Sequence, residues 1–208
     1  MTSTKKGDWM TVEELMAQLE GDPEWVKQRD ERDRLHAEKV AQNCEDAKPL
    51  IAALRAAGVS LDSLNDVIQV EKLHPAVVPV LLEHLDREKS DYVRGSMALA
   101  LAVPEAIIGW QRIKVAFLSD PNPTTDVSRT KWQWALALGA IANDSLLDEV
   151  IELLQNPAHG RDRVPLIQVL LRSKDPKAKK VLAELESDPV IGKDAKMARK
   201  KGRWPWSK

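Results

Sequence analysis

The stretch that decides the fold is PAVVPVLLEHLDREKSDYVRGSMALAL, residues 75–101. It holds an apolar segment that begins at Pro75, a polar break from Asp86 to Asp91, and a second apolar segment that ends at Leu101. Apolar residues recur in both segments at helical spacing, so the stretch predicts two helices joined by a turn. One helix pair cannot bury its apolar face alone, and it must therefore stack on neighbouring pairs.

Similar units follow along the chain. Polar breaks recur at residues 156–162 and 173–176, and first helices are predicted to begin near Pro75, Pro104, Asp144 and Asp175. These starts are about 29 to 40 residues apart, which is typical of helical-pair repeats. The segment from Asp126 to Ala142 is apolar on almost every side from Trp132 onward, which predicts a helix buried between its neighbours. A repeat domain is therefore expected over residues 59–201.

The chain before the repeats has a different character. Residues 1–10 are polar and are predicted to be disordered, and residues 11–58 are predicted to form an N-terminal helical extension. Thr11 and Glu14 have the spacing of a capping box at the start of a first helix. A second helix is expected from Pro23, with a kink or break near Pro49.

The second helix of this extension carries an almost wholly charged stretch at residues 27–39. Opposite charges there stand four residues apart, as in Lys27 and Glu31 or Arg34 and Glu38, and each such pair supports a solvated helix by about 0.2–0.5 kcal/mol. A surface-lying or projecting helix is therefore predicted.

Composition points to an all-α fold, because Gly is scarce and the β-branched and aromatic runs of strands are missing. No apolar run reaches the roughly 18 residues that a membrane span needs, and the N-terminus has no apolar signal segment. The single cysteine, Cys44, has no partner for an internal disulfide and no clustered His for a metal site. A cytoplasmic protein without a metal or cofactor is expected.

Charge is distributed unevenly along the chain. Residues 1–159 hold 17 Lys/Arg and 26 Asp/Glu, a balance of −9, whereas residues 160–208 hold 14 and 6, a balance of +8. In a linear stack of helices, this asymmetry would become a separation in space. Solvated faces of no particular function are the alternative interpretation.

The segment Asp91-Tyr92-Val93-Arg94, followed by Ala98-Leu99-Ala100-Leu101, resembles the second helix of HEAT repeats. Residues 81–86 look like the end of the first helix of the same unit, and the resemblance covers roughly residues 60–190. The helix expected over residues 126–142 departs from the pattern, because it lacks the Val-Arg pair. The resemblance implies a right-handed α-solenoid of about four HEAT-like helix pairs.

HEAT proteins are mostly non-catalytic scaffolds and binding platforms, so the resemblance implies an interaction module that binds another macromolecule through its concave face. In that architecture the second helices line the concave face. The partner-binding candidates on or near those helices are Arg94, Arg129, Trp132, Trp134, Arg161, Arg163 and Arg172. Trp132 and Trp134 stand about 200° apart on a helix, so one of them is predicted in the core and the other in the groove. Core packing for the tryptophans and a solvated face for the arginines are the alternative.

The C-terminal segment is basic and interleaved with tryptophan, and residues 202–208 are predicted to be a tail. Such a composition is typical of segments that bind nucleic acid or an anionic surface, although the cap of a last helix is equally basic. The candidates for interaction through this segment are Arg199, Lys200, Lys201, Arg203, Trp204 and Trp206.

Catalysis finds little support in the sequence, and no catalytic residue is predicted. The four histidines, His36, His74, His84 and His159, lie in different segments, and no Ser or Cys stands beside one in a nucleophile setting. Protein binding, by a scaffold, adaptor or immunity-type inhibitor, is the favoured hypothesis. The alternative is a nucleic-acid-binding protein that uses the basic C-terminal third, with a HEAT-like DNA glycosylase using Trp132, Trp134 and Asp126 as its most specific form.

Overall fold

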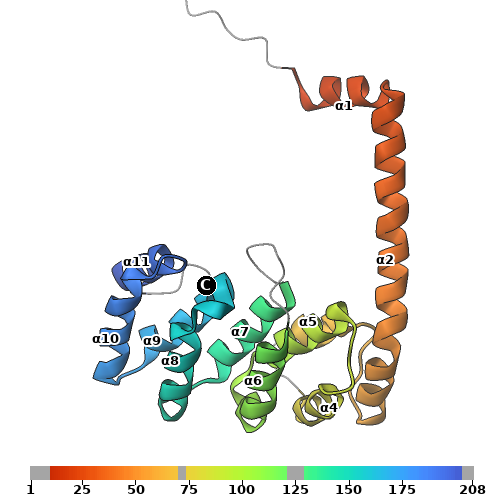
Figure 1. Ribbon diagram of the computed structural model, residues 1–208. Coiled ribbons are helices and arrows are strands. Elements are labelled where there is room, and N and C mark those ends of the chain that lie inside the picture. Colours follow the sequence, from red (N-terminus) through yellow and green to blue (C-terminus); the bar gives the residue numbers. More distant parts are fainter. Residues whose placement is uncertain (1–9, 70–73, 121–128, 203–208) are drawn as a thin grey trace, which may run out of the picture. The chain divides into compact units, whose positions relative to one another are not determined.

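The computed structural model describes residues 10–69, 74–120 and 129–202, and every regular element in these ranges is a helix (Figure 1). The all-α prediction is therefore confirmed. The chain divides into two compact units, residues 1–45 and 46–208. The division falls inside a long helix, whereas the sequence places the end of the N-terminal extension at residue 58. Residues 1–10 were predicted to be disordered, and residues 1–9 of that segment lie outside the described residues.

The first unit contains α1 (Val12–Glu20) and the N-terminal part of α2 (Pro23–Ala56). The predicted capping box is present, because the Glu14 N–H donates to the Thr11 hydroxyl and the Thr11 N–H donates to the Glu14 carboxylate. Asp22 then starts α2 by accepting from the Glu24 N–H at 2.9 Å. None of the residues of α1 is buried.

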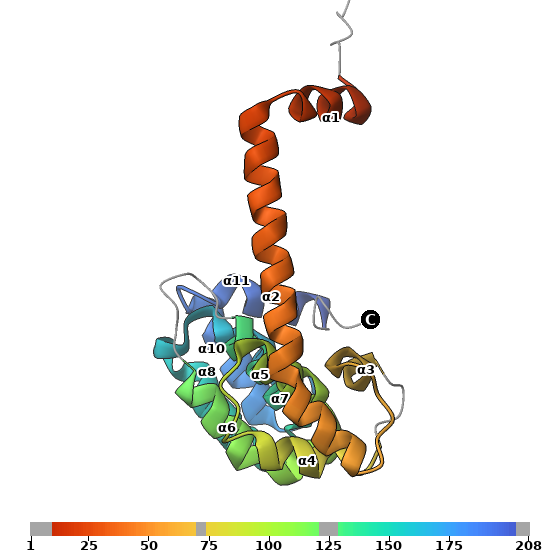
Figure 2. The same cartoon turned by 90° about the vertical axis from the view of Figure 1, so that its right-hand side faces the viewer.

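The charged stretch of α2 lies in water, as predicted, because residues 31–42 are all exposed. Arg34 forms ion pairs with Glu31 and Glu38, three and four residues away. Of the predicted kink or break near Pro49, the break is wrong, because α2 continues through Pro49 to Ala56 (Figure 2). The first buried side chains of α2 are Ala47, Leu50 and Leu54, which belong to the second unit.

The second unit continues with short helices separated by turns. Its elements after α2 are α3 (Leu64–Gln69), α4 (Val77–His84), α5 (Asp91–Ala100), η1 (Pro104–Gly109), α6 (Trp110–Ser119), α7 (Arg129–Ile141), η2 (Asp144–Leu146), α8 (Leu147–Gln155), η3 (Pro157–Leu166), α9 (Ile167–Arg172), α10 (Pro176–Glu184), η4 (Leu185–Ser187) and α11 (Gly192–Lys201). We call α4, α6, α8 and α10 the first helices, and α5, α7, η3–α9 and α11 the second helices.

The second helices contact one another in chain order. α5 packs on α7, α7 packs on η3 and α9, and α9 packs on α11. Three of the first helices also pack on second helices: α6 on α7, α8 on η3 and α9, and α10 on α9 and α11. Every described second helix therefore has helical neighbours on more than one side (Figure 1).

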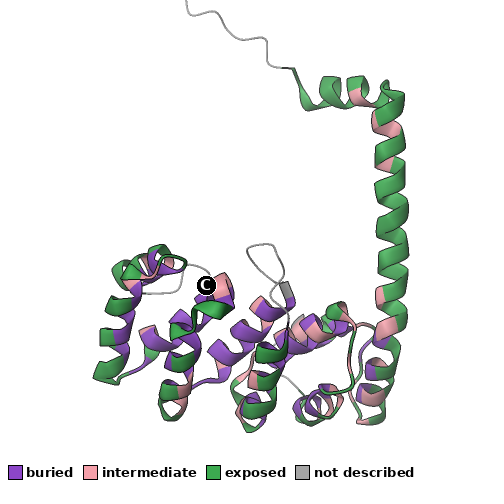
Figure 3. Cartoon of the chain, viewed as in Figure 1, coloured by how far each residue is buried: buried purple, intermediate pink, exposed green. Residues whose placement is uncertain are grey.

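The core is centred on α7, as its apolar sequence predicts. Ala135, Ala137 and Leu138 have no exposed surface, and Trp134 is 1% exposed. Figure 3 shows α7 coloured almost wholly as buried or intermediate, whereas α6, α8 and α10 also carry exposed residues. The described core thus runs along the second helices, and α7 lies deepest in it because none of its described residues is exposed.

Candidate binding surface

One side of α7 is left partly exposed by the core. Trp132, Leu136 and Ala140 stand four residues apart and are each partly exposed. Side chains four residues apart lie on the same face of a helix, so the three form one apolar row. Tyr92 and Leu99 on α5 and Leu171 on α9 are partly exposed in the same way. We call the row of Trp132, Leu136 and Ala140 the second-helix face.

Two glycines allow the helices under this face to approach closely. A Cβ atom added to Gly95 of α5 would lie 2.3 Å from Oε1 of Gln133 on α7. One added to Gly139 of α7 would lie 2.3 Å from Nε2 of Gln168 on α9. Real Cβ atoms never come so near, so only glycine fits without displacing these glutamines. The same Gly–Gln contact therefore joins α5 to α7 and α7 to α9.

The two predicted tryptophans have different surroundings. Trp134 is almost fully buried, whereas Trp132 is only partly covered by the core. Trp134 is therefore not available to a partner in this conformation, and its assignment to the binding surface is corrected. The glycosylase hypothesis loses the same residue, and its Asp126 lies outside the described residues.

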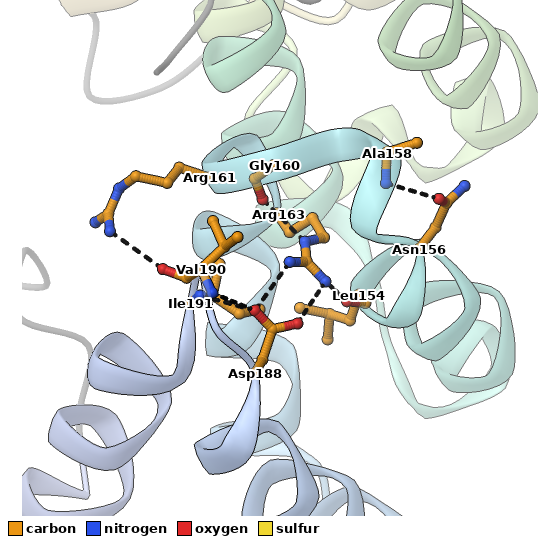
Figure 4. A network of polar contacts seen from close by, with 9 residues as sticks. All are labelled: Leu154, Asn156, Ala158, Gly160, Arg161, Arg163, Asp188, Val190 and Ile191. Atoms are coloured by element: carbon orange, nitrogen blue, oxygen red, sulfur yellow. Dashed lines mark hydrogen bonds and ion pairs between the residues drawn. The ribbon is translucent and has the colours of Figure 1, made fainter.

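Arg163 is placed at the centre of a polar network rather than on a binding surface (Figure 4). Its guanidinium is fully buried and donates to Leu154 O at 2.7 Å and to Gly160 O at 2.9 Å. It also forms a two-point pair with Asp188, at 3.1 Å from Nη2 to Oδ1 and 3.0 Å from Nη1 to Oδ2. Because Arg163 is fully buried and each of its three guanidinium nitrogens has a partner inside the protein, it is withdrawn as a partner contact.

Asp188 is held in its charged form by this network. Burial alone raises the pKa of Asp188, but N–H groups of Ile191 and Val190 and the Arg163 guanidinium together lower it below its ordinary value. The two backbone donors lie 2.9 and 2.8 Å from Oδ1. One carboxylate thus organises the turn before α11 and joins it to η3.

Arg161 and Arg172 also make internal contacts. Arg161 pairs with Asp194 of α11 at 3.1 Å and donates to Val190 O at 3.4 Å. Arg172 donates to Ala142 O and Ala140 O, the carbonyl groups at the C-terminal end of α7. A cation at this end also opposes the negative end of the helix dipole. Both side chains keep solvent access, but each has a structural role that the sequence did not reveal.

Arg94 repeats the arrangement of Arg163. It forms an ion pair with Asp120, whose side chain is almost fully buried at the end of α6. Asp120 directly follows α6, and Asp188 directly follows η4, the short helix after α10; the two have nearly the same backbone angles, φ −68° and ψ 127° against φ −66° and ψ 129°. Burial raises the pKa of Asp120, while Arg94 and Lys131 oppose that rise. The side chain of Arg129, a further candidate, is not described.

A buried polar cluster lies beside this pair, and sequence reasoning missed it. Lys131 donates to Asp120 O at 3.2 Å, and its ammonium lies 5.1 Å from the centre of the Phe117 ring. The edge of the His159 ring meets Phe117 with 4.9 Å between centroids. Burial lowers the pKa of Lys131, and the charge of Asp162, which is also buried, opposes part of that lowering.

His159 is kept neutral by this environment. Burial, followed by the charges of Lys131 and Arg163, lowers the pKa of His159 from 6.5 to about 4. The only sequence signal for the cluster was a lysine inside an otherwise apolar helix. The cluster joins three elements: Lys131 of α7 contacts Asp120 after α6, and Phe117 of α6 contacts His159 of η3.

The candidates at the C-terminus are only partly described. Arg199 forms an ion pair with Glu186, and Lys200 and Lys201 are exposed on α11. Arg203, Trp204 and Trp206 lie outside the described residues. Within residues 10–69, 74–120 and 129–202 there is no cluster of His, Cys, Asp or Glu able to hold a metal ion. In the same ranges no helix is both long and apolar enough to cross a membrane.

Comparisons with known proteins leave the family open. No family model matches the chain, and neither a curated protein nor a solved structure shows significant similarity to it. The functional argument therefore rests on the residues of this protein alone.

Proposed function

We propose that this protein is a non-enzymatic interaction module that binds another protein through the second-helix face. Its architecture in this proposal is a right-handed α-solenoid of about four HEAT-like helix pairs. The biological role that fits such a module is that of a scaffold, an adaptor or an immunity-type inhibitor.

The observation that carries the proposal is the row of Trp132, Leu136 and Ala140 on α7. These apolar side chains are partly exposed on the helix that is otherwise the most buried in the second unit. An aromatic residue beside aliphatic ones, on a rigid support, is typical of the centre of a protein interface.

The solenoid architecture is supported by contacts that recur from one helix pair to the next. The Arg94–Asp120 pair joins the second helix α5 to the residue after α6, and the Arg163–Asp188 pair joins η3 to the residue after η4, which follows α10. The two Gly–Gln contacts each join neighbouring second helices. Repeated units that contact only their neighbours are the defining feature of repeat proteins.

The proposal also explains why the face, rather than the arginines, would bind a partner. Arg94, Arg163 and Arg172 are engaged with acids or carbonyl groups of the protein itself. Releasing them would leave buried acceptors unsatisfied, at a cost of about 1–3 kcal/mol for each group. The second-helix face can be covered by a partner without breaking any such contact.

Replacing Leu136 by Glu is the direct test. A carboxylate at the centre of an apolar interface must be desolvated without a counter-ion, so Leu136→Glu is expected to weaken partner binding by at least about 10-fold, or about 1.4 kcal/mol. The partner is captured from nuclease-treated host lysate at raised salt, and its retention is compared by quantitative mass spectrometry.

Leu118→Glu provides a matched control, because Leu118 is 45% exposed on the first helix α6. This change introduces the same group outside the second-helix face, and partner binding is expected to stay within about 2-fold of the parent. Circular dichroism establishes that both variants fold. Equal binding by the two variants, or a loss confined to Leu118→Glu, contradicts the proposal.

A further inference from the structure

The last helix, α11, has two opposite faces. Gly192, Ala195 and Ala198 are buried against its neighbours. At 100° per residue, Lys193, Lys196 and Lys200 fall within about 60° of one another on the other side of the helix. All three are exposed. We call them the lysine stripe.

The acids near the stripe are already paired with arginines. Glu186 pairs with Arg199, Asp188 with Arg163, and Asp194 with Arg161, and these three are the only acids between residues 185 and 202. Within the part of the chain that the structure describes, no ion pair involves a lysine of the stripe. The stripe therefore keeps its full positive charge toward solvent.

Helix capping does not explain the whole stripe. Lys200 lies in the last turn, where the helix dipole favours a cation. Lys193 is the second residue of α11, at the positive end of the dipole, where a cation is disfavoured. Placing Lys193 there lowers local stability, and an anionic ligand would remove that disadvantage.

The stripe also has a firm support. A Cβ atom on Gly192 would lie 2.6 Å from the backbone oxygen of Glu186, so the start of α11 packs directly on the backbone of η4. The lysines therefore project from a helix fixed at one end by close backbone contact and along its length by buried alanines. A ligand would meet three cations over about 10 Å of helix axis.

We propose that the lysine stripe binds the phosphate backbone of nucleic acid, as a site distinct from the second-helix face. Lysine ammonium groups without apolar neighbours suit phosphate, whereas the cores of protein interfaces are depleted in lysine. A membrane-binding helix turns an apolar face outward, but the apolar face of α11 is buried.

Fluorescence anisotropy with a labelled duplex DNA of about 20 base pairs tests the proposal on the full-length protein. With three phosphate contacts, a plot of the logarithm of the binding constant against the logarithm of the KCl concentration has a slope near −2.7. The affinity for the duplex is therefore expected to fall about 40-fold between 50 and 200 mM KCl. The Lys193→Ala/Lys196→Ala/Lys200→Ala variant is expected to bind at least about 10-fold more weakly at 50 mM KCl, with a shallower slope. Alanine favours helix at exposed positions, so α11 is expected to remain folded.

The matched control is Lys27→Ala/Lys39→Ala/Lys89→Ala, which removes the same charge from exposed lysines elsewhere. Its DNA affinity is expected to stay within about 3-fold of the parent. The proposal is overturned if the parent protein does not bind the duplex, or if the control variant loses as much affinity as the stripe variant. Binding to vesicles with 30% anionic lipid, in the absence of binding to DNA, overturns it in favour of a membrane surface.

Discussion

Replacing Arg163 by Ala is expected to lower the free energy of unfolding by about 3–5 kcal/mol, the usual cost of breaking a buried ion pair. The change leaves the Asp188 carboxylate without its counter-ion and the carbonyl groups of Leu154 and Gly160 without a donor. It also opens space where a fully buried side chain stood. Urea denaturation followed by circular dichroism measures the loss.

Arg161→Ala is the matched control for this prediction. Arg161 is two residues away, also pairs with an aspartate, and has 40% of its side chain exposed. An ion pair with this solvent access contributes at most about 1 kcal/mol, so the loss is expected to be small. If the two variants lose the same stability, the description of Arg163 as the buried centre of the network is wrong.

Acidification is expected to destabilise the protein through His159. The pKa of His159 is about 4 in the folded protein and 6.5 without the fold, so the unfolded chain binds the proton more readily. Stability is therefore retained above about pH 6.5 and falls as the pH drops toward 4, by about 2 kcal/mol between pH 7.5 and pH 5. Urea denaturation at both pH values measures the change.

The His159→Gln variant removes the titrating group while keeping a polar side chain beside Phe117. Its stability at pH 7.5 is expected to be lower than that of the parent, because the edge-to-face contact of the rings is lost. Its stability is expected to change less between pH 7.5 and pH 5. An unchanged pH dependence in this variant would show that His159 is not the group responsible.

Several features of the fold could be predicted from local sequence. The capping box of Thr11 and Glu14 follows from two residues three apart, and the burial of α7 follows from its apolar composition. A long helix through Pro49 was among the expectations, but local sequence left open whether that helix breaks at the proline. Proline removes one backbone donor, and whether the helix absorbs that loss depends on the packing of residues such as Leu50 and Leu54.

The partners of the arginines could not be predicted from the sequence. Their placement on the second helices was inferred, but an arginine has five donors and its partner depends on folding. Arg163 finds an aspartate 25 residues away, and Arg94 finds one 26 residues away. Nothing in the local sequence identifies Asp120 or Asp188 as a partner, because both resemble ordinary turn residues.

The cluster of Lys131, His159 and Asp162 was missed for the same reason. These groups come from two segments that meet only when α7 packs on η3. Gly160, with φ 52°, bends the chain within η3 and brings Arg163 back toward its carbonyl oxygen. The sequence shows the glycine, but it does not show in which direction the chain bends there.

Site-specific photo-crosslinking tests the central claim, that the second-helix face binds the partner, most directly. A photoreactive amino acid is placed at Leu136 in one protein and at Leu118 in another, and each is irradiated with the captured partner. We expect crosslinks from position 136 and none from position 118. Crosslinks from position 118 alone would contradict the proposal and place the partner on the first helices.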